Sequence, residues 1–545
     1  MKLSRRVRYL ILGFMLFLNM ALIWPNSNHE RGVDGFLSHV LAESISEHGY
    51  AKWVLHPLSF FNLYPMSAES GIPYLLSSFS QMSGVNLEFT ILFFSILFKL
   101  ICLIGIYLFL RLVVKNEMFI FLGLFAYIIS PMVIHFTSWT IIVRQPFISL
   151  IPIMLIILFS ERVTRFKKIF IIAGLVFTAF AFSRMSLLLV PLFLAYFVSS
   201  FIYSSKRNIL ETKVLANRGL RAFLYLGIVI ILFSLAVFGF SFYAPHPFTK
   251  TLLFEGENII YIFLNIIVRY VSGFGLLFLI IPFAILNFLI IKKLTKFQFM
   301  MMFFTILYSY IILDSLYVMQ FMIVFLALLI PVGFEFISRY IKNNGHFVPL
   351  AFSIATLAIL FTLLYPLARE EITGETIETN FSTNDDTYDC GVYLGYYLEE
   401  DESYICNDVK VSRATQAYSN RNPGDIDGTN YLIYDRKDGN ELISTKVKDF
   451  GLEDFVRRKG INAEIDDWKY SGEYSTKRHY WQLTTKEPND KNWQVLHEEK
   501  FRTVVLSERS DFVYKFGKES LFFNWAEDSL YLTYANGNIR AYHLA

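Results

Sequence analysis

Long stretches of apolar residues with few charges recur along the first two thirds of this 545-residue chain. The segments around Leu97, Leu124 and Leu326 are examples, and Leu, Ile and Phe dominate each of them. A helix needs about 20 such residues to cross the hydrocarbon core of a bilayer. Hydrophobic residues make up 54% of the chain and charged residues 17%, which fits a membrane protein better than a soluble one. We therefore predict a polytopic α-helical membrane protein.

The apolar runs predict about eleven transmembrane helices. The first run, Tyr9 to Trp24, follows several basic residues and has no small-residue cleavage site after it, so we predict a retained signal anchor. The other runs are centred near Leu97, Leu124, Ile153, Gly174, Leu194, Ile231, Ile280, Leu307, Leu326 and Leu357.

Basic residues in the loops predict the orientation. Lys and Arg concentrate in alternate loops, for example 161–168 and 206–221, whereas the intervening loops contain few. Because Lys and Arg favour short cytoplasmic loops, the N-terminus is predicted to be cytoplasmic. We predict that the chain is a multi-pass protein of the cell membrane. An odd number of spans then places its C-terminal part on the extracytoplasmic side.

The chain changes character near residue 368. Residues 1–368 are predicted to form the membrane domain, and the polar residues 369–545 a soluble extracytoplasmic domain of α/β or β-rich type. A hairpin is predicted around Asn536-Gly537 and a helix near 452–458. Cys390 and Cys406 are either a disulfide or two buried thiols. A net charge of +3 without a basic aromatic cluster excludes nucleic acid as a partner.

The outer loop 26–88 is much longer than the others, and long ordered loops are usually functional. Apolar residues from Phe36 to Ile45 fall at helical spacing, with Gly49 placed to end the helix, which predicts an amphipathic helix along the membrane surface. A second such helix is predicted from Ala68 to about Met82. Asp34 precedes the first helix, where a cap or a first-turn carboxylate is the simplest interpretation.

The order of residues in this loop resembles the GT-C superfamily of membrane glycosyltransferases. Archaeal and bacterial members that use polyprenyl-phosphate-linked sugars show a similar order of motifs, which here reads Asp34, His39, Gly49, Tyr64-Pro65 and Gly84. The C-terminal residues 534–542 also look like the tail of large archaeal proteins of this kind. The resemblance covers the membrane domain and implies a GT-C-like fold with surface helices in the first outer loop.

The resemblance also implies an activity. It implies a glycosyltransferase that moves a hexosyl or pentosyl group from a polyprenyl (dolichyl) phosphate carrier to a glycan, lipid or protein at the outer membrane face. On this interpretation Asp34 is the catalytic base and the reaction inverts the anomeric configuration. Partners are then the lipid-linked donor, the acceptor and membrane lipids.

Further residues are candidates for binding the substrates. The departing lipid phosphate needs cations, and a guanidinium suits it because it stays charged and binds in a fork. The alternative for an Arg at a helix end is that it reaches the headgroups without binding substrate. The arginine candidates are Arg144, Arg184 and Arg269, and the other candidates are His39, Tyr64 and Glu69.

A metal is less strongly indicated. Superfamily members that transfer oligosaccharides hold a divalent metal with acids in a second outer loop, but the corresponding residues 130–145 contain no acid. This departure favours a metal-independent transferase of single sugars. Asp314 is a weak candidate ligand, and a divalent cation is the one cofactor left open.

Two other classes of function remain as alternatives. A transporter or flippase of lipid-linked glycans would share the topology, although the sequence shows no internal repeat of the kind common in transporters. A catalytically inactive relative that acts in envelope assembly is the other alternative. No phosphate loop, dinucleotide fingerprint or zinc pattern occurs in the chain.

Overall fold

The three-dimensional structure is a computed structural model that describes the chain in separate stretches. The described residues are 4–24, 28–49, 53–54, 71–137, 139–141, 144–160, 164–182, 189–204, 218–237, three residues between 267 and 271, 273–291, 294–309, 316–341, a few residues between 353 and 361, 385–399, 402–406, 409–419, 421–423, 433–434, 501–507 and 526–544. Every structural statement below concerns these residues.

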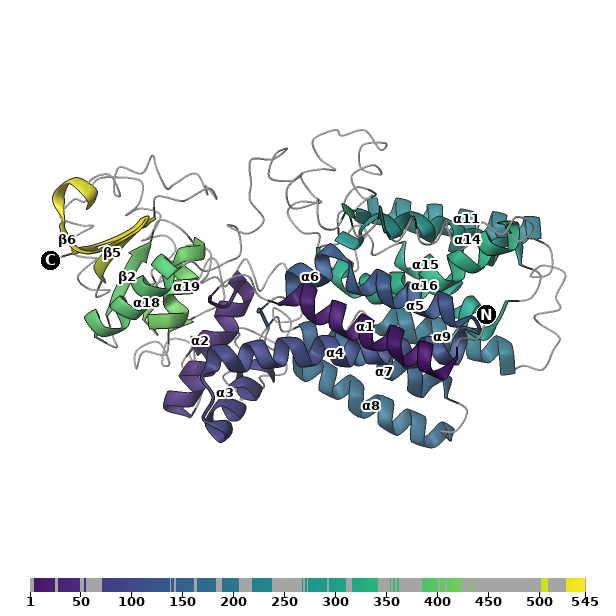
Figure 1. The fold of residues 1–545 in the computed structure, drawn as a ribbon, viewed down its shortest axis with the longest axis horizontal. Coiled ribbons are helices and arrows are strands. Elements are labelled where there is room, and N and C mark those ends of the chain that lie inside the picture. Colours follow the sequence, from purple (N-terminus) through teal and green to yellow (C-terminus); the bar gives the residue numbers. More distant parts are fainter. Residues whose placement is uncertain are drawn as a thin grey trace, which may run out of the picture.

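Helices occupy the apolar segments of residues 1–368, the predicted membrane domain (Figure 1). The first ten predicted apolar centres fall in α1 (Arg5–Ile23), α4 (Leu87–Val113), α5 (Glu117–Ile128), α7 (Arg144–Phe159), α8 (Arg165–Phe182), α9 (Leu189–Ser204), α11 (Arg218–Val237), η4 (Leu276–Ile280) continued by α14 (Ile281–Ile290), α15 (Lys296–Tyr308) and α16 (Leu316–Ile341). Only scattered residues are described around Leu357.

Two helical segments are long and apolar enough to cross a membrane, as judged by length and composition among the described residues. They are Leu87–Val113 and Gln320–Arg339, and six shorter apolar helices have 10–17 residues. The count of about eleven spans therefore stays a prediction.

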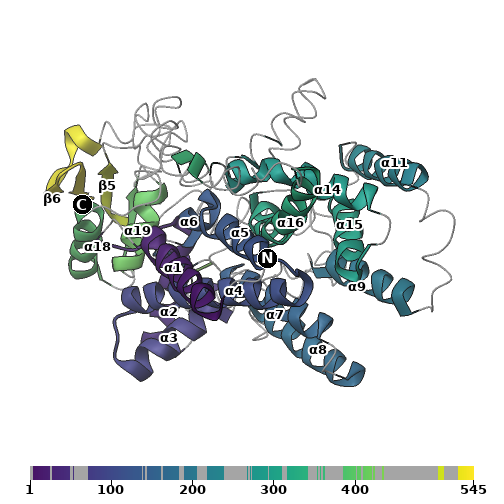
Figure 2. The same cartoon turned by 45° about the vertical axis from the view of Figure 1, so that its right-hand side comes forward.

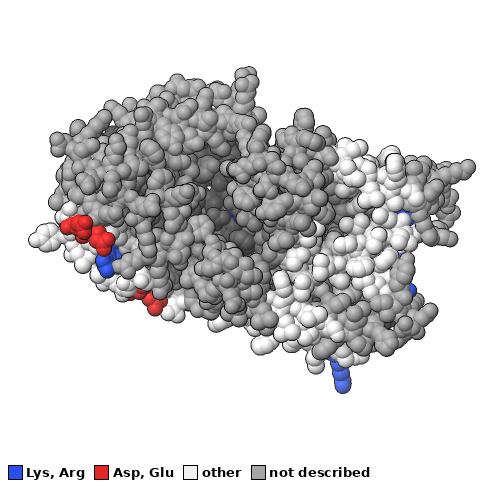
Figure 3. Space-filling view, turned by 90° about the horizontal axis from the view of Figure 1, so that it is seen from above, with Lys and Arg blue, Asp and Glu red and all other residues white. Residues whose placement is uncertain are grey.

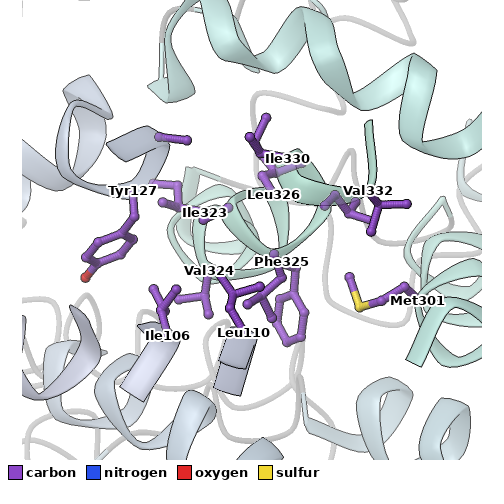
Figure 4. Packing of buried hydrophobic residues seen from close by; sticks show 14 of the residues in the cluster. Ile106, Leu110, Tyr127, Met301, Ile323, Val324, Phe325, Leu326, Ile330 and Val332 are labelled. Atoms are coloured by element: carbon purple, nitrogen blue, oxygen red, sulfur yellow. The ribbon is translucent and has the colours of Figure 1, made fainter. Parts of the chain in front are cut away.

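Helix α16 lies at the centre of the bundle. Its residues Phe321 to Ile330 are almost fully buried, because α5, α7 and α14 pack around it. Figure 4 shows Ile106 and Leu110 of α4 and Met301 of α15 close to this helix. A helix that is apolar on all sides needs such complete covering. The fold thus places α16 at the core and α1, α8 and α11 at the periphery (Figure 1).

A glycine permits close packing of α16 against α14. A methyl group added at Gly333 would lie 2.6 Å from both the Cγ2 atom and the backbone oxygen of Ile280. We expect Gly333→Ala to destabilise the protein by about 1–3 kcal/mol, because backbone atoms cannot move aside cheaply. Gly227→Ala in α11 is the matched control, since it has open space around it. Thermal unfolding in nanodiscs should show a lower midpoint for the first variant and no loss for the second.

Charged groups are unevenly distributed on the described surface. In the view from above, Asp and Glu appear at the end occupied by the C-terminal strands, whereas Lys and Arg predominate at the opposite end (Figure 3). The N-terminus of α1, with its basic residues, lies at that opposite end (Figure 1).

The described residues of loop 26–88 include two helices, α2 (Val33–His48) and α3 (Gly71–Ser83). Helix α2 ends at Gly49, whose φ of +78° allows the left-handed conformation that commonly closes a helix, so this part of the prediction is confirmed. The described part of the second predicted helix, up to Met82, falls within α3.

Helix α2, predicted as an amphipathic helix along the membrane surface, packs against other helices of the protein. Phe36, Val40 and Leu41 pack against helix α19 (Val409–Ser419), while Ala42 packs against residues of α3. Ser38 between them is also buried. Figures 1 and 2 both show α2 between α3 and α19. Other helices of the protein therefore cover the apolar face that the sequence predicts for α2.

The C-terminal part contains a mixed sheet with helices beside it. The strand order is β3 (Asn422–Pro423), β2 (Ser403–Cys406), β5 (Phe501–Ser507), β7 (Ile539–His543) and β6 (Tyr531–Asn536). Strand β2 is parallel to β3 and β5, whereas β7 is antiparallel to both of its neighbours. Strands β6 and β7 form the predicted hairpin, and Gly537 in its turn has a φ of +53°.

Helix α18 (Asp385–Tyr397) and the sheet enclose the two cysteines of this part. Cys390 and Cys406 are both buried and no disulfide joins them, so the alternative of two buried thiols is the one that the structure has. Burial raises the pKa of the Cys390 thiol to about 12, which keeps it protonated. The helix predicted near 452–458 lies outside the described residues.

Candidate functional site

Asp34 lies in the first turn of α2. The helix begins at Val33, after Gly32, whose φ of +91° directs the chain into the helix. Asp34 is therefore a first-turn residue and not the cap. A carboxylate at this position is favoured by the positive end of the helix dipole.

The first turn of α2 lies against the segment that leads into α7. A methyl group added at Gly32 or at Gly35 would lie 2.7 Å from the Oγ1 atom of Thr140. The lack of a side chain at both positions permits this close approach. The backbone of Asp34 is thus fixed next to the residues that immediately precede Arg144.

Trp139 anchors this contact in an unusual backbone conformation. Its φ is +43°, and among the described residues it is the one with a positive φ that is not glycine. Its carbonyl accepts a hydrogen bond of 2.9 Å from the backbone N–H of Arg31, and its indole N–H donates to the carbonyl of Glu88 at 3.2 Å. Sparsely populated conformations persist only where surrounding contacts hold them, and they cluster at functional sites.

Arg144 begins α7 and lines a cavity in the bundle. Its Nη1 atom donates to the Oε1 atom of Gln320 in α16, at 3.3 Å. The cavity has a volume of about 40 Å³ and lies between α4, α5, α7 and α16. Its polar lining residues are Lys99, Tyr127, Arg144, Gln145, Ser149 and Gln320.

Lys99 is a residue of this cavity that the sequence interpretation missed. It is 1% exposed and comes from the middle of α4. The sequence alone indicates Lys99 as a candidate, because a lysine inside an apolar run is costly in a membrane and usually has a function. Gln145 and Gln320 carried no comparable signal, since an amide near a helix end is common.

A buried ion pair joins Glu30, just before α2, to His39 within α2. The Nδ1 atom of His39 lies 2.5 Å from the Oε1 atom of Glu30, and the two side chains are 8% and 1% exposed. Burial raises the pKa of Glu30. Burial opposes the charged form of His39, but the negative charge and hydrogen bond of Glu30 outweigh it and raise the pKa of His39. His39, predicted to bind substrate, is thus occupied by a partner within the protein.

Glu88 connects this pair to the C-terminal part. Its Oε1 atom accepts from the backbone N–H of Glu30 at 2.9 Å and from the hydroxyl of Tyr418 at 3.3 Å, and it lies 3.3 Å from the Nδ1 atom of His29. The ring of His29 stacks on Tyr388 of α18, with ring centres 3.9 Å apart. Residues from the first loop, α4, α18 and α19 therefore form one polar cluster.

The ion pair predicts that stability depends on pH. The pKa of His39 is raised above its ordinary value of about 6.5, and that of Glu30 above its ordinary value of about 4.3. Above those ordinary values the folded protein retains protons that the unfolded chain has lost. The stabilisation is therefore fully present at low pH and is lost as the pH rises through the folded-state values. The unfolding midpoint should fall as the pH rises above about 6.5, the ordinary pKa of histidine, and His39→Gln should flatten this dependence.

Several predicted site residues cannot be placed. Tyr64, Glu69, Arg184, Arg269 and Asp314 all lie outside the described residues. Of the predicted set, the structure brings Arg144 and the backbone of Asp34 into one region. Among the described residues, His, Cys, Asp and Glu form no group of three that could hold a metal ion.

No family model matches the chain, and no curated protein matches it. A solved structure that resembles it is the crystal structure of ArnT from Cupriavidus metallidurans in the apo state, with a TM-score of 0.48 and 11% sequence identity. The match covers 98% of this chain and 97% of that one.

Proposed function

We propose that this chain is a membrane glycosyltransferase that moves a sugar from a polyprenyl-phosphate carrier to an acceptor hydroxyl at the outer face of the membrane. The membrane domain holds the carrier lipid, and the first outer loop supplies the base. The acceptor is a glycan, lipid or protein of the cell envelope. The order of motifs in loop 26–88 is what first suggests this class of enzyme.

One observation carries the proposal. The turn of α2 that contains Asp34 packs, through Gly32 and Gly35, on Thr140, four residues before Arg144. A carboxylate for the acceptor and a guanidinium for the phosphate thus come from neighbouring backbone segments. Phosphate binds well to a guanidinium, because the planar fork matches two of its oxygens.

The proposed reaction is a single displacement. The acceptor oxygen attacks the anomeric carbon while the bond from that carbon to the phosphate oxygen breaks. The carboxylate of Asp34 takes the hydroxyl proton, and polyprenyl phosphate leaves with the bonding electron pair. Because the nucleophile enters opposite the leaving group, the configuration inverts.

The described contacts also suggest how the base is held in place. Helix α2 packs against α3 on one side and α19 on the other, and Glu30, just before the helix, pairs with His39 within it. A catalytic group is effective only when its own backbone is fixed by its surroundings. The polar cluster around Glu30 and Glu88 is thus proposed to position α2 without touching substrate.

The test is sugar transfer by the full chain in nanodiscs. A panel of polyprenyl-phosphate sugars is offered with a mixture of membrane-derived acceptors, and the release of polyprenyl phosphate is measured with and without a chelator. Transfer that persists with chelator supports the metal-independent mechanism. No release from any donor in a broad panel would contradict the proposal and favour a transporter of lipid-linked glycans, which flipping assays in vesicles would detect.

A further inference from the structure

Lys99 is buried without a partner for its charge. Its side chain is 1% exposed, and its Nζ atom has no hydrogen-bond partner among the described residues. An ammonium group in an apolar interior costs several kcal/mol unless an anion or hydrogen-bond acceptors compensate it. Such a residue persists in a membrane helix mainly where it has a function.

The described residues that line this cavity with Lys99 include a second basic side chain. Arg144 lines the same cavity, and neither Asp nor Glu is among its described lining residues. Two amide groups there also have unused donors, because the Nε2 atoms of Gln145 and Gln320 are buried and have no partner among the described residues. The Oε1 atom of Gln320 accepts from Arg144, which leaves its Nε2 atom free to donate. Among the described residues, the unpaired donors of the site come from Lys99, Gln145 and Gln320, and the one unpaired acceptor beside them is the Oε1 atom of Gln145.

The packing of α4 against α7 places these donors at the same height along the two helices. Cys102 of α4 contacts the carbonyl of Ile148 in α7, and Gly105, one turn further along α4, packs on Pro152, one turn further along α7. The two helices therefore run in the same direction here. Lys99, one turn before Cys102, is level with the first turn of α7, where Arg144 and Gln145 lie.

The size and surroundings of the cavity fit a small oxyanion. A volume of about 40 Å³ corresponds to about three water molecules, which suits a phosphate group and is too small for a sugar ring. The cavity lies at the N-terminal end of the 16-residue helix α7, whose dipole and free N–H groups favour an anion. Phe98, Ile148 and Ile323 supply an apolar lining beside the donors.

We propose that this cavity is a phosphate-binding site in which Lys99 and Arg144 provide the charge and the amides of Gln145 and Gln320 complete the hydrogen bonds. The phosphate is the headgroup of the polyprenyl carrier, a step that rests on the proposed function. Lys99 is a substrate-binding residue that recognises the carrier whichever sugar it bears.

The test is direct binding to the full chain in nanodiscs, without sugar transfer. The probes are a short-chain polyprenyl monophosphate, the neutral polyprenol of the same length and inorganic phosphate. The monophosphate should bind and the polyprenol should not. Lys99→Met, which keeps most of the side-chain length, should weaken monophosphate binding by about 10- to 100-fold, as expected for loss of a hydrogen bond to a charged group. Lys115→Met, at an exposed lysine beyond the inner end of α4, is the matched control and should change nothing.

Each outcome decides between clear alternatives. Lys99→Met should unfold at the same or a higher temperature than the wild type in phosphate-free buffer, because it removes an unpaired buried charge. Weaker binding by this variant would then not result from a folding defect. Binding of inorganic phosphate alone, dependent on Lys99, supports the oxyanion site and assigns it to free phosphate. Unchanged binding of both phosphate probes in Lys99→Met overturns the site. Lys99-dependent binding in a protein that transfers no sugar would instead overturn the proposed function and retain the site.

Discussion

Asp34→Asn is expected to slow sugar transfer by about 100- to 10,000-fold, the usual contribution of a general base. The asparagine has nearly the same size and can still occupy the first turn of α2, but it cannot accept the proton of the acceptor hydroxyl. The measurement is release of polyprenyl phosphate under saturating donor. Expression and the thermal unfolding midpoint should stay close to the wild type, because a first-turn carboxylate contributes only about 0.3–1 kcal/mol to the helix.

Two controls make this result interpretable. Glu47→Gln removes an acidic group from the exposed part of the same helix and should leave turnover unchanged. Asp34→Glu keeps the carboxylate but moves it by one methylene, so it should retain part of the activity and the same pH profile. A full wild-type rate in Asp34→Asn would remove this residue from the mechanism.

Glu30→Ala is expected to destabilise the protein by about 3–5 kcal/mol, because it leaves His39 buried without its partner. The matched control is the exposed pair Arg540 and Glu527, whose side chains are 40% and 50% exposed. Glu527→Ala should cost no more than about 1 kcal/mol, since solvent screens an exposed pair. Thermal unfolding in nanodiscs compares the two variants.

The double variant Glu30→Leu/His39→Leu separates charge from packing. Replacing a buried pair by apolar residues is often close to neutral, so the double variant should be more stable than Glu30→Ala. If Glu30→Ala unfolds at the wild-type temperature, the pair does not hold α2 in place. The positioning role proposed for it would then be wrong.

Local features of the fold could be predicted from the sequence. The apolar runs located the helices, Gly49 marked the end of α2, and Asn536-Gly537 marked the hairpin, because each depends on a few neighbouring residues. The surroundings of α2 could not be predicted. Its contact with α19 joins residues more than 350 positions apart, and apolar spacing indicates that a face is buried without indicating what buries it.

The candidate site also contains some residues that the sequence indicates and others that only the packing reveals. Asp34 and Arg144 stood out through their residue types and positions near helix ends, and the structure places their backbones in one region. Glu30 and Glu88 did not stand out, because acidic residues in a polar loop are usually solvated. Their importance comes from burial, which only the packing of α2, α4 and α19 creates. Lys99 could have been found from its apolar neighbours alone.

The packing of α2 on α19 has a consequence for the order in which the protein is made. Helix α2 ends at His48 and α19 begins at Val409, so the ribosome completes the first outer loop long before its packing partner. At ~5–20 residues per second, the delay is on the order of tens of seconds. During that time Phe36, Val40 and Leu41 lack the surface that later covers them. In the nascent chain, a chaperone or the membrane surface must therefore shield the apolar face of α2 until the C-terminal part has been synthesised.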